Sequence, residues 1–332
     1  MKIDFVIPWV DGSDPSWRTE KYKCMGIDEP DAGDERYRDM GILKYWFRAV
    51  EAYAPWVNQI HFITWGHLPE WLNTACPKLH IVNHQDYIPR EYLPTFSSHP
   101  IELNIHRIPG LSEHFVYFND DMLLNAPVTP EFFFKKGLPC DFAHINNVYR
   151  SNPIDVYEHV RVNCTWVTCN HHSYIKSFLR NPFKYVTIHY PLKNIAKNIL
   201  KLENAGVFQG FEDHHLPNAY MKSTLEETWE ESSEFLHHTC CNKFRTPLDV
   251  SQSVFRYKQL AQGKFTPVSR QSRGKYVSMN SAISSITADI LNSTHKMLCI
   301  NDVPDLPNYE QIAAAVTAAY EQKLPNKSAF EK

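Results

Sequence analysis

Long apolar runs are missing from the chain: none comes near the roughly 18 consecutive apolar residues that a membrane-spanning helix needs. The first residues, Met1 to Phe5, include an acid at Asp4, and no long apolar stretch follows them, unlike a signal peptide. Repeats and low-complexity linkers are missing as well. We therefore expect a cytoplasmic protein, or one that touches the inner face of the cell membrane only peripherally.

An excess of positive charge is also lacking, because 34 Lys and Arg residues stand against 37 Asp and Glu residues and give a net charge of -3. General binding to nucleic acid needs a basic surface that displaces counterions, so this balance argues against it. Cysteine is scarce, with eight residues in 332, and favours reduced core thiols over a disulfide framework. The Cys and His residues between positions 164 and 241 match neither C-x-x-C nor H-E-x-x-H spacing, so structural zinc is the weaker alternative.

Short apolar runs bounded by turn residues are abundant in the first 125 residues and predict buried strands. These runs cover residues 3–10, 59–64, 79–82 and 115–118. Apolar residues at helical spacing lie between them, ahead of Pro55 and again at 101–111. Alternating strands and helices predict an α/β protein with a mainly parallel twisted sheet flanked by helices.

The rest of the chain is less regular. Residues 136–235 are rich in His, Asn and Tyr and are predicted to form an irregular or helical insertion that covers the sheet's edge. Helices are expected at 223–235, 248–260 and 309–322, and a last core strand at 296–300. We expect a single catalytic domain over 1–332, with an α/β half at 1–135, the remainder of the active site at 236–305 and a C-terminal helix at 306–332.

Acidic and amide side chains follow three of the predicted strands, at Asp11-Gly12, Asn119-Asp120-Asp121 and Asn301-Asp302. Ligands bind outside the carboxyl ends of strands in such sheets, and carboxylate oxygens suit a divalent cation that bridges a diphosphate. Asn-Asp alone more often makes a turn or a helix cap. For Asp120–Asp121 the cation is favoured, because a turn needs only one acid.

Two further groups have open interpretations. Glu102 and His106 lie one helical turn apart with Arg107 beside them, which fits a polar face at the mouth of the sheet or a surface pair of little energetic worth. His215 precedes the turn at Pro217 and could be a rigidly held base, although a single histidine is more often structural.

Four blocks of sequence resemble the Stealth family. These proteins are sugar-1-phosphate transferases, and they include bacterial capsule and exopolysaccharide phosphotransferases and the lysosomal-enzyme N-acetylglucosamine-1-phosphotransferase. The blocks are Ile7 to Pro15, Arg36 to Asp121, His215 to Pro217 with Phe244 to Asp249, and Cys299 to Asp302. One departure matters: residues 40–45 read MGILKY where many members have an acidic, arginine-containing helix start, so no catalytic acid is assigned there.

The resemblance implies a GT-A-like (Rossmann-like) nucleotide-sugar fold, with the donor bound by residues 1–135. It implies transfer of a hexose 1-phosphate, for example N-acetylglucosamine 1-phosphate, from a UDP-sugar to a glycan hydroxyl, with release of UMP. The products would be phosphodiester links in a capsular or cell-surface polysaccharide. The acceptor would be a growing glycan on a lipid carrier, which implies transient membrane contact.

The resemblance also suggests roles for particular residues. His215 would be the base, with Asp249 as its partner or as a second positioning group, and Glu102, His106, Arg107 and Arg245 would complete the catalytic set. Asp11, Gly12, Arg38 and Asp39 would bind the donor. Asp120 would have a catalytic or metal-binding role, and Asp121, Asn301 and Asp302 would be the other residues of a Mg2+ or Mn2+ site.

Two other functions fit the same residues. A glycosyltransferase of this fold would release UDP instead of UMP. A glycan-binding protein without catalysis would use the many aromatic residues as stacking platforms, but it would have no chemical need for the acids, the histidine and both arginines together.

Overall fold

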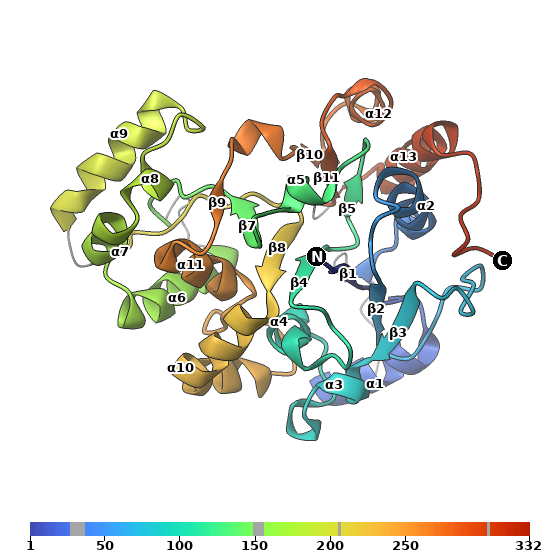
Figure 1. Ribbon diagram of the computed structural model, residues 1–332. Coiled ribbons are helices and arrows are strands. Elements are labelled where there is room, and N and C mark those ends of the chain that lie inside the picture. The colour runs from blue at the N-terminus through green and yellow to red at the C-terminus, as the bar shows by residue number, and fades with distance from the viewer. Residues whose placement is uncertain (27–36, 149–155, 205–206, 304–305) are drawn as a thin grey trace.

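The computed structural model of the chain describes residues 1–26, 37–148, 156–204, 207–303 and 306–332 (Figure 1). Arg36, which opens the second block, lies outside these ranges. The central sheet has five strands in the order β3-β2-β1-β4-β8. They are β1 (Ile3–Pro8), β2 (Ile60–Thr64), β3 (Leu79–Asn83), β4 (His114–Tyr117) and β8 (Asn218–Met221).

Four of the five strands are parallel. β1 pairs with β2 and β4 in parallel, β2 pairs with β3 in parallel, and β8 closes the edge antiparallel to β4. The carboxyl ends of β1 to β4 therefore meet at one edge, where ligands bind in sheets of this kind. The prediction of an α/β fold with a mainly parallel sheet is confirmed.

Two small sheets flank the central one. β10 (Lys275–Ser278), β11 (Met297–Asn301) and β5 (Met122–Leu124) form the first, and β6 (Phe134–Lys135), β7 (Leu138–Asp141) and β9 (Thr266–Pro267) form the second. The strand predicted at 296–300 exists as β11, but it pairs with β10 and β5 and not with the central sheet. β5 begins directly after Asp121, so the carboxylate pair lies where the chain passes from one sheet to another.

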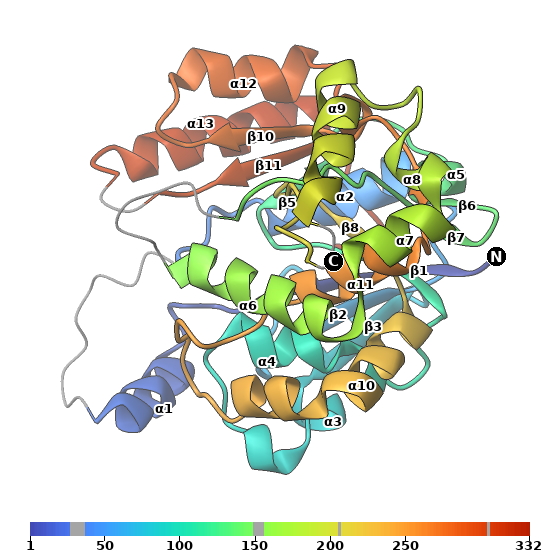
Figure 2. The same cartoon turned by 90° about the vertical axis from the view of Figure 1, so that its left-hand side faces the viewer.

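Helices cover both faces of the central sheet (Figures 1 and 2). Alternate residues of β1 divide between two apolar cores: Phe5 and Ile7 join one core and Val6 the other. The first core is closed by α2 (Leu43–Tyr53) and α13 (Tyr309–Lys323), and the second by α4 (Ser98–Leu103), α10 (Lys222–Cys240) and α11 (Ser253–Gln262). A strand buried on both faces needs apolar or fully paired residues. Most positions of β1 and β2 are apolar, and the two buried ionisable residues, Asp4 and His61, pair with each other at 3.1 Å.

The region at 136–235 contains more regular structure than expected. It holds α6 (Val156–His171), α7 (Tyr174–Arg180), α8 (Pro182–Tyr185) and α9 (Leu192–Leu200). It also supplies β8, which completes the central sheet. None of the described helices is long and apolar enough to cross a bilayer.

Two predicted helices are wrong in their bounds. The helix expected at 101–111 is α4 followed by a 3-10 turn, Ile105–Arg107. It breaks at Asn104, whose side chain donates to the Pro100 carbonyl at 2.9 Å and accepts from Arg107 at 3.0 Å. The helix expected at 248–260 begins at Ser253, because the Asp249 carboxylate accepts from the Thr246 amide and holds a turn.

Candidate active site

Asp121 is the residue at which β4, β11 and the His215 loop meet. Its carbonyl accepts from the Ile300 amide at 2.9 Å, which ties it to β11. Its Oδ2 lies 3.2 Å from the Cys299 thiol and 3.3 Å from Nε2 of His215. Its Oδ1 is buried and has no hydrogen-bond partner among the described residues. A buried carboxylate oxygen left unsatisfied in this way is the kind of atom that a cation would bind.

The three ligand atoms of Asp121, His215 and Cys299 lie within 4.8 Å of one another, the one such group of His, Cys, Asp and Glu in the described ranges. Burial and the charges of Asp121 and Asp120 raise the pKa of the Cys299 thiol well above its ordinary value. It therefore stays protonated and donates to Asp121. A neutral thiol is a poor ligand for a hard divalent cation, so the carboxylate of Asp121 is the member of this group that suits one.

Asp120 differs from its neighbour. Its side chain is open to solvent, yet the protein packed around the carboxyl and the charges of Asp121 and Asp39 raise its pKa to about 7. Two carboxylates this close repel each other, and a bound cation would relieve that repulsion.

His215 is the sequence-predicted base, and the structure brings it to Asp121. Burial works to lower the pKa of His215, but the hydrogen bond and charge of Asp121, with the charges of Glu102 and Asp120, outweigh burial and raise it. His215 thus belongs to one electrostatic unit with the carboxylate pair.

A cavity of about 200 Å3 opens beside His215, and we call it the β4 cavity. Glu102, Asn119, Arg245 and His215 line it, as do several residues that were not predicted from the sequence. These are Ser98, His99, Met122, Val156, Tyr157, Val160, Asp213, His214, Asn218, Ser251, Gln252, Ser253 and Arg256. Glu102 accepts from the Tyr117 hydroxyl and the Gln252 amide, both at 3.3 Å.

Asp249 is not the partner of His215. Its carboxylate lies 2.9 Å from Nδ1 of His99, and it also accepts from Asn242 and Thr246. Burial works to raise the pKa of Asp249, but these hydrogen bonds lower it, so the carboxylate is ionised. An ionised Asp249 holds His99 with Nδ1 as the donor, and Nε2 remains for a ligand in the β4 cavity.

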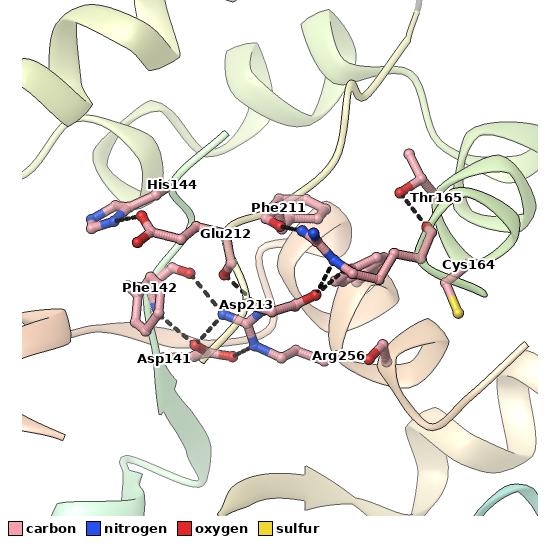
Figure 3. Close-up of polar contacts among 12 residues, drawn as sticks. Asp141, Phe142, His144, Cys164, Thr165, Phe211, Glu212, Asp213 and Arg256 are labelled. Atoms are coloured by element: carbon pink, nitrogen blue, oxygen red, sulfur yellow. Dashed lines mark hydrogen bonds and ion pairs between the residues drawn. The ribbon is translucent and has the colours of Figure 1, made fainter. Parts of the chain in front are cut away.

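A buried ion-pair network holds the loop that carries His215 (Figure 3). Arg256 on α11 donates to both oxygens of Asp141 at 2.8 and 2.9 Å and to Asp213 at 3.0 Å. Asp213 also accepts from Arg161 at 2.6 Å and from the Tyr257 hydroxyl at 2.7 Å. Asp213 is two residues before His215, so the network fixes the start of that loop.

A second cavity, of about 390 Å3, lies at the carboxyl end of β1, and we call it the β1 cavity. Asp11, Gly12, Arg38 and Asp39, all predicted to bind the donor, line it together with Ser13, Trp17, Arg18, Lys21, Tyr22, Tyr37, Tyr309 and Glu310. The Lys21 ammonium lies 4.1 Å from the centre of the Tyr37 ring. A Cβ at Gly12 would collide with the Tyr37 carbonyl, so the close approach of these two segments requires glycine.

The carboxylate pair lies between the two cavities. Asn119 and Met122, which flank it, line the β4 cavity. Asp39, whose charge acts on Asp120, lines the β1 cavity. A molecule that occupied both cavities would therefore pass the two acids.

The other predicted residues have different surroundings. Asp302 pairs with Arg38 at 2.9 Å, and the Arg38 guanidinium lies 4.1 Å from the Tyr309 ring centre. Asn301 ends β11. His106 and Arg107 line neither cavity and pack against Trp229 on α10. Burial and the Arg107 charge lower the pKa of His106 to about 3, which suits a neutral core histidine.

Sequence reasoning missed His99 and the Arg256 network. His99 directly precedes Pro100, the same kind of signal that pointed to His215, and that signal could have found it. Arg256 gave no local signal, because its main partner Asp141 is 115 residues away in the chain.

Comparison with known proteins identifies two family regions. The family described as Stealth protein CR1, conserved region 1, matches residues 1–28, and Stealth protein CR2, conserved region 2, matches residues 36–140. Among solved structures, the chain is similar to the galactosyltransferase LgtC in complex with donor and acceptor sugar analogues, with 9% identity, 95% of each chain covered and a TM-score of 0.42.

Three relatives match over nearly their whole length. The chain is 40% identical to the capsular polysaccharide phosphotransferase WcwK of Streptococcus pneumoniae, with 99% of both covered. It is 37% identical to the receptor polysaccharide phosphotransferase WefC of Streptococcus gordonii, with 99% of both covered. It is also 37% identical to the exopolysaccharide phosphotransferase cps2G of Lactiplantibacillus plantarum, with 99% of this chain and 96% of the relative covered. The chain therefore belongs to the Stealth family and is a phosphotransferase.

Proposed function

We propose that the enzyme transfers a hexose 1-phosphate, such as N-acetylglucosamine 1-phosphate, from a UDP-sugar to a hydroxyl of a capsular or cell-surface glycan, with release of UMP. The observation that carries this proposal is the carboxylate pair Asp120–Asp121, set between two cavities of different character. The β1 cavity has four aromatic side chains and three cationic ones, beside three acids, and the aromatic and cationic groups suit the base and the phosphates of a nucleotide. The β4 cavity is lined by three histidines, two arginines and two carboxylates, which are groups that can bind an acceptor hydroxyl and take its proton. The relatives, named polysaccharide phosphotransferases, support the same class of reaction.

The donor would lie in the β1 cavity. Its base and ribose would pack on the rings of Trp17 and Tyr37, with the Asp11-Gly12 turn against the uridine. Arg38 would provide a planar, charged donor for phosphate oxygens. Tyr309 and Glu310 also line this cavity, beside the residues from 1–135. The C-terminal helix α13 would therefore contribute to donor binding as well.

The carboxylate pair would hold Mg2+ or Mn2+ against the diphosphate. The unsatisfied Oδ1 of Asp121 supports this role, and the raised pKa of Asp120 supports a cation nearby. Asn301 and Asp302 would be further oxygen ligands. Asp302 would then give up its ion pair with Arg38 in order to bind the cation. When bound, the ion would neutralise charge on the phosphoryl oxygens.

In the reaction, the acceptor hydroxyl oxygen would attack the β-phosphorus of the donor. The bond from that phosphorus to the bridging oxygen would break, and UMP would leave with its electron pair. His215 would take the hydroxyl proton, because it lies beside Asp121 and therefore beside the reacting phosphate. Arg245, whose side chain donates to Ser98 at the rim of the β4 cavity, would contact phosphate oxygens.

His99 would position the acceptor from the other wall of the β4 cavity. Asp249 holds it by Nδ1, and it has no contact with the carboxylate pair among the described residues. His99→Ala is expected to raise the KM for the acceptor, whereas His215→Ala is expected to lower kcat by about 100-fold or more. A pure kcat effect of His99→Ala with an unchanged KM would contradict this division of roles.

Release of the nucleotide tests the reaction. The enzyme would be incubated with a UDP-sugar labelled in both the sugar and the β-phosphate, together with a crude acceptor glycan. We expect UMP, and both labels in the glycan. UDP release with only the sugar label transferred would identify a glycosyltransferase and overturn the proposal. An absence of turnover with intact glycan binding would favour a binding protein instead.

We further propose that the acceptor glycan is attached to a lipid carrier and that the enzyme works at the inner face of the cell membrane. A growing polysaccharide on a lipid would keep its reacting end near the bilayer. Peripheral contact would then be sufficient, because only the glycan end has to reach the β4 cavity.

A further inference from the structure

The outermost helix of the region at 136–235, α9, is oriented against the usual amphipathic rule. It buries two asparagines, Asn194 and Asn198, while Leu192 is 85% exposed and Leu200 is 66% exposed. A surface helix normally turns its apolar side inward and its polar side outward. α9, which lies at the outer end of the molecule (Figure 1), does the reverse.

Hydrogen bonds fix this orientation. The Asn198 side chain accepts from the Ile145 amide at 2.9 Å and donates to the carbonyls of Ala143 and Tyr185, both at 2.8 Å. The Tyr174 hydroxyl donates to the Asn198 carbonyl at 2.7 Å. Rotating α9 to bury its leucines would leave these buried polar groups without partners, and that is costly. The hydrogen bonds of the inner, polar side therefore hold the apolar side of α9 outward.

The helices next to α9 also expose large apolar side chains. Leu179 at the end of α7 is 71% exposed, Phe183 in α8 is 84% exposed, and Ile188 before α9 is 96% exposed. Asn198 bonds to both α7 and α8, so the three helices form one unit at the outer end of the molecule. We call the exposed set the α7–α9 face, and it comprises Leu179, Phe183, Ile188, Leu192, Ile199 and Leu200.

Charge on this unit is of one sign. Residues 173–202 include six cationic residues and no Asp or Glu, in a chain whose total charge is -3. The six are Lys176, Arg180, Lys184, Lys193, Lys197 and Lys201. None of them forms an ion pair with an acid in the described ranges. On α9, Lys193 and Lys197 lie one turn apart at the border of the apolar side.

We propose that the α7–α9 face docks on an anionic phospholipid bilayer, with its apolar side chains in the interface and its lysines at the headgroup phosphates. Exposed leucine and phenylalanine beside lysine are what an interfacial helix presents to a membrane. A second copy of the chain is a poorer partner, because an isologous contact would bring the same cations together. The anionic surface supplies the charge that the protein lacks here.

Docking there would hold the β4 cavity close to the lipid. Asn198 bonds to Ala143 and Ile145, and the intervening His144 carbonyl accepts from the Glu212 amide at 2.8 Å. Glu212 is three residues before His215. Hydrogen bonds through residues 143–145 thus link the docked face to the loop that carries His215. This consequence, unlike the docking itself, depends on the proposed function.

Vesicle co-sedimentation of the full chain tests the docking without donor or acceptor. Vesicles would contain phosphatidylcholine alone, or phosphatidylglycerol and phosphatidylcholine in equal parts. We expect binding to the mixed vesicles only. Leu192→Ser/Leu200→Ser and Lys193→Glu/Lys197→Glu should each weaken binding by about tenfold or more. Leu248→Ser is the matched control, because Leu248 is 69% exposed and lies outside this face.

Either double variant binding like the unchanged protein would overturn the proposal, as would equal binding to neutral vesicles. Failure of the unchanged protein to sediment would overturn it too. Light scattering after size-exclusion chromatography is the second measurement. A dimer that the leucine variant abolishes would assign the face to a second copy instead. UMP release with a soluble acceptor is expected to be unchanged in both double variants, so a failure of docking and a failure of the proposed reaction are distinguishable.

Discussion

Replacing Arg256 with methionine should destabilise the protein more than any comparable change near the site. Methionine keeps most of the apolar stem but removes the guanidinium. Asp141 then loses both of its charged hydrogen bonds, at 2.8 and 2.9 Å, although its side chain remains buried. Asp213 keeps Arg161 and Tyr257. One buried carboxylate is thus left without its cation, and the other is not.

The magnitude follows from this difference. Removing one partner of a buried pair costs about 3–5 kcal/mol in the free energy of unfolding, and we expect Arg256→Met to fall in that range. Arg161→Met should cost less, about 1–3 kcal/mol, because Asp213 still accepts from Arg256 and Tyr257. Adding Asp141→Asn to Arg256→Met should recover a large part of the loss, because the stranded charge is gone.

Urea unfolding followed by tryptophan fluorescence measures these costs. The pH dependence adds a second check. In the unchanged protein, burial works to raise the pKa of Asp141 but Arg256 lowers it, so this carboxylate contributes stability above its unfolded pKa that is lost in acid. In Arg256→Met, burial is opposed only by the weaker effects of the His214 charge and the Phe142 amide, so we expect the pKa of Asp141 to be raised and the variant to gain stability as the carboxyl is protonated. The difference in the free energy of unfolding between the unchanged protein and Arg256→Met should therefore narrow as the pH falls.

A loss below about 1 kcal/mol in the free energy of unfolding of Arg256→Met would refute this reasoning, because a buried carboxylate without a charged partner destabilises a protein by more than that. A double variant, Arg256→Met/Asp141→Asn, whose loss of stability equals the sum of the two single losses would also refute it, because additive losses mean that the two residues are not coupled. A stability difference that widens in acid would show that Asp141 is not the carboxylate left without its cation.

The remaining predictions concern the carboxylate pair and the β1 cavity. Metal affinity, measured by calorimetry, should rise as the pH increases through about 7, where Asp120 ionises. Asp39→Asn should move that rise to lower pH, because it removes one of the charges that raise the Asp120 pKa. An unchanged pH profile of metal affinity in Asp39→Asn would contradict this coupling. Asp121→Asn should abolish metal binding at every pH, because it removes the charge of the carboxylate whose Oδ1 is buried without a partner among the described residues. Gly12→Ala should raise the Kd for UDP by about tenfold through the clash with Tyr37, with thermal unfolding as the control for folding.

The strands of the central sheet could be predicted from the sequence because their signal is local. Strands buried on both faces are mostly apolar, so β1 and β2 are visible as largely apolar runs that end at turn residues, although each contains one buried ionisable residue, Asp4 or His61. β8 could not be found this way. It has four residues, pairs on one side only and begins with Asn218, so neither length nor pattern separates it from a loop.

The candidate site could be predicted in part for the same reason. Asp11 and Asp120 follow the ends of β1 and β4, and parallel strands bring such ends to one edge. The failures were pairings across the chain. The partner of Asp249 proved to be His99, 150 residues away, and helical spacing suggested a shared face for Glu102 and His106 that the break at Asn104 removes. Spacing cannot reveal either, because both depend on tertiary contacts.

The adjacency of the two acids has a structural explanation. Asp121 is fixed from one side, by Ile300, Cys299 and His215, whereas Asp120 is opposed from the other side by Asp39. Neither acid could be moved along the chain without losing these neighbours. The charge repulsion that helps to raise the pKa of Asp120 is therefore inherent in the position of the two acids. A divalent cation between the two acids would remove that repulsion, and it would stand where a diphosphate reaching from the donor side would meet an acceptor hydroxyl.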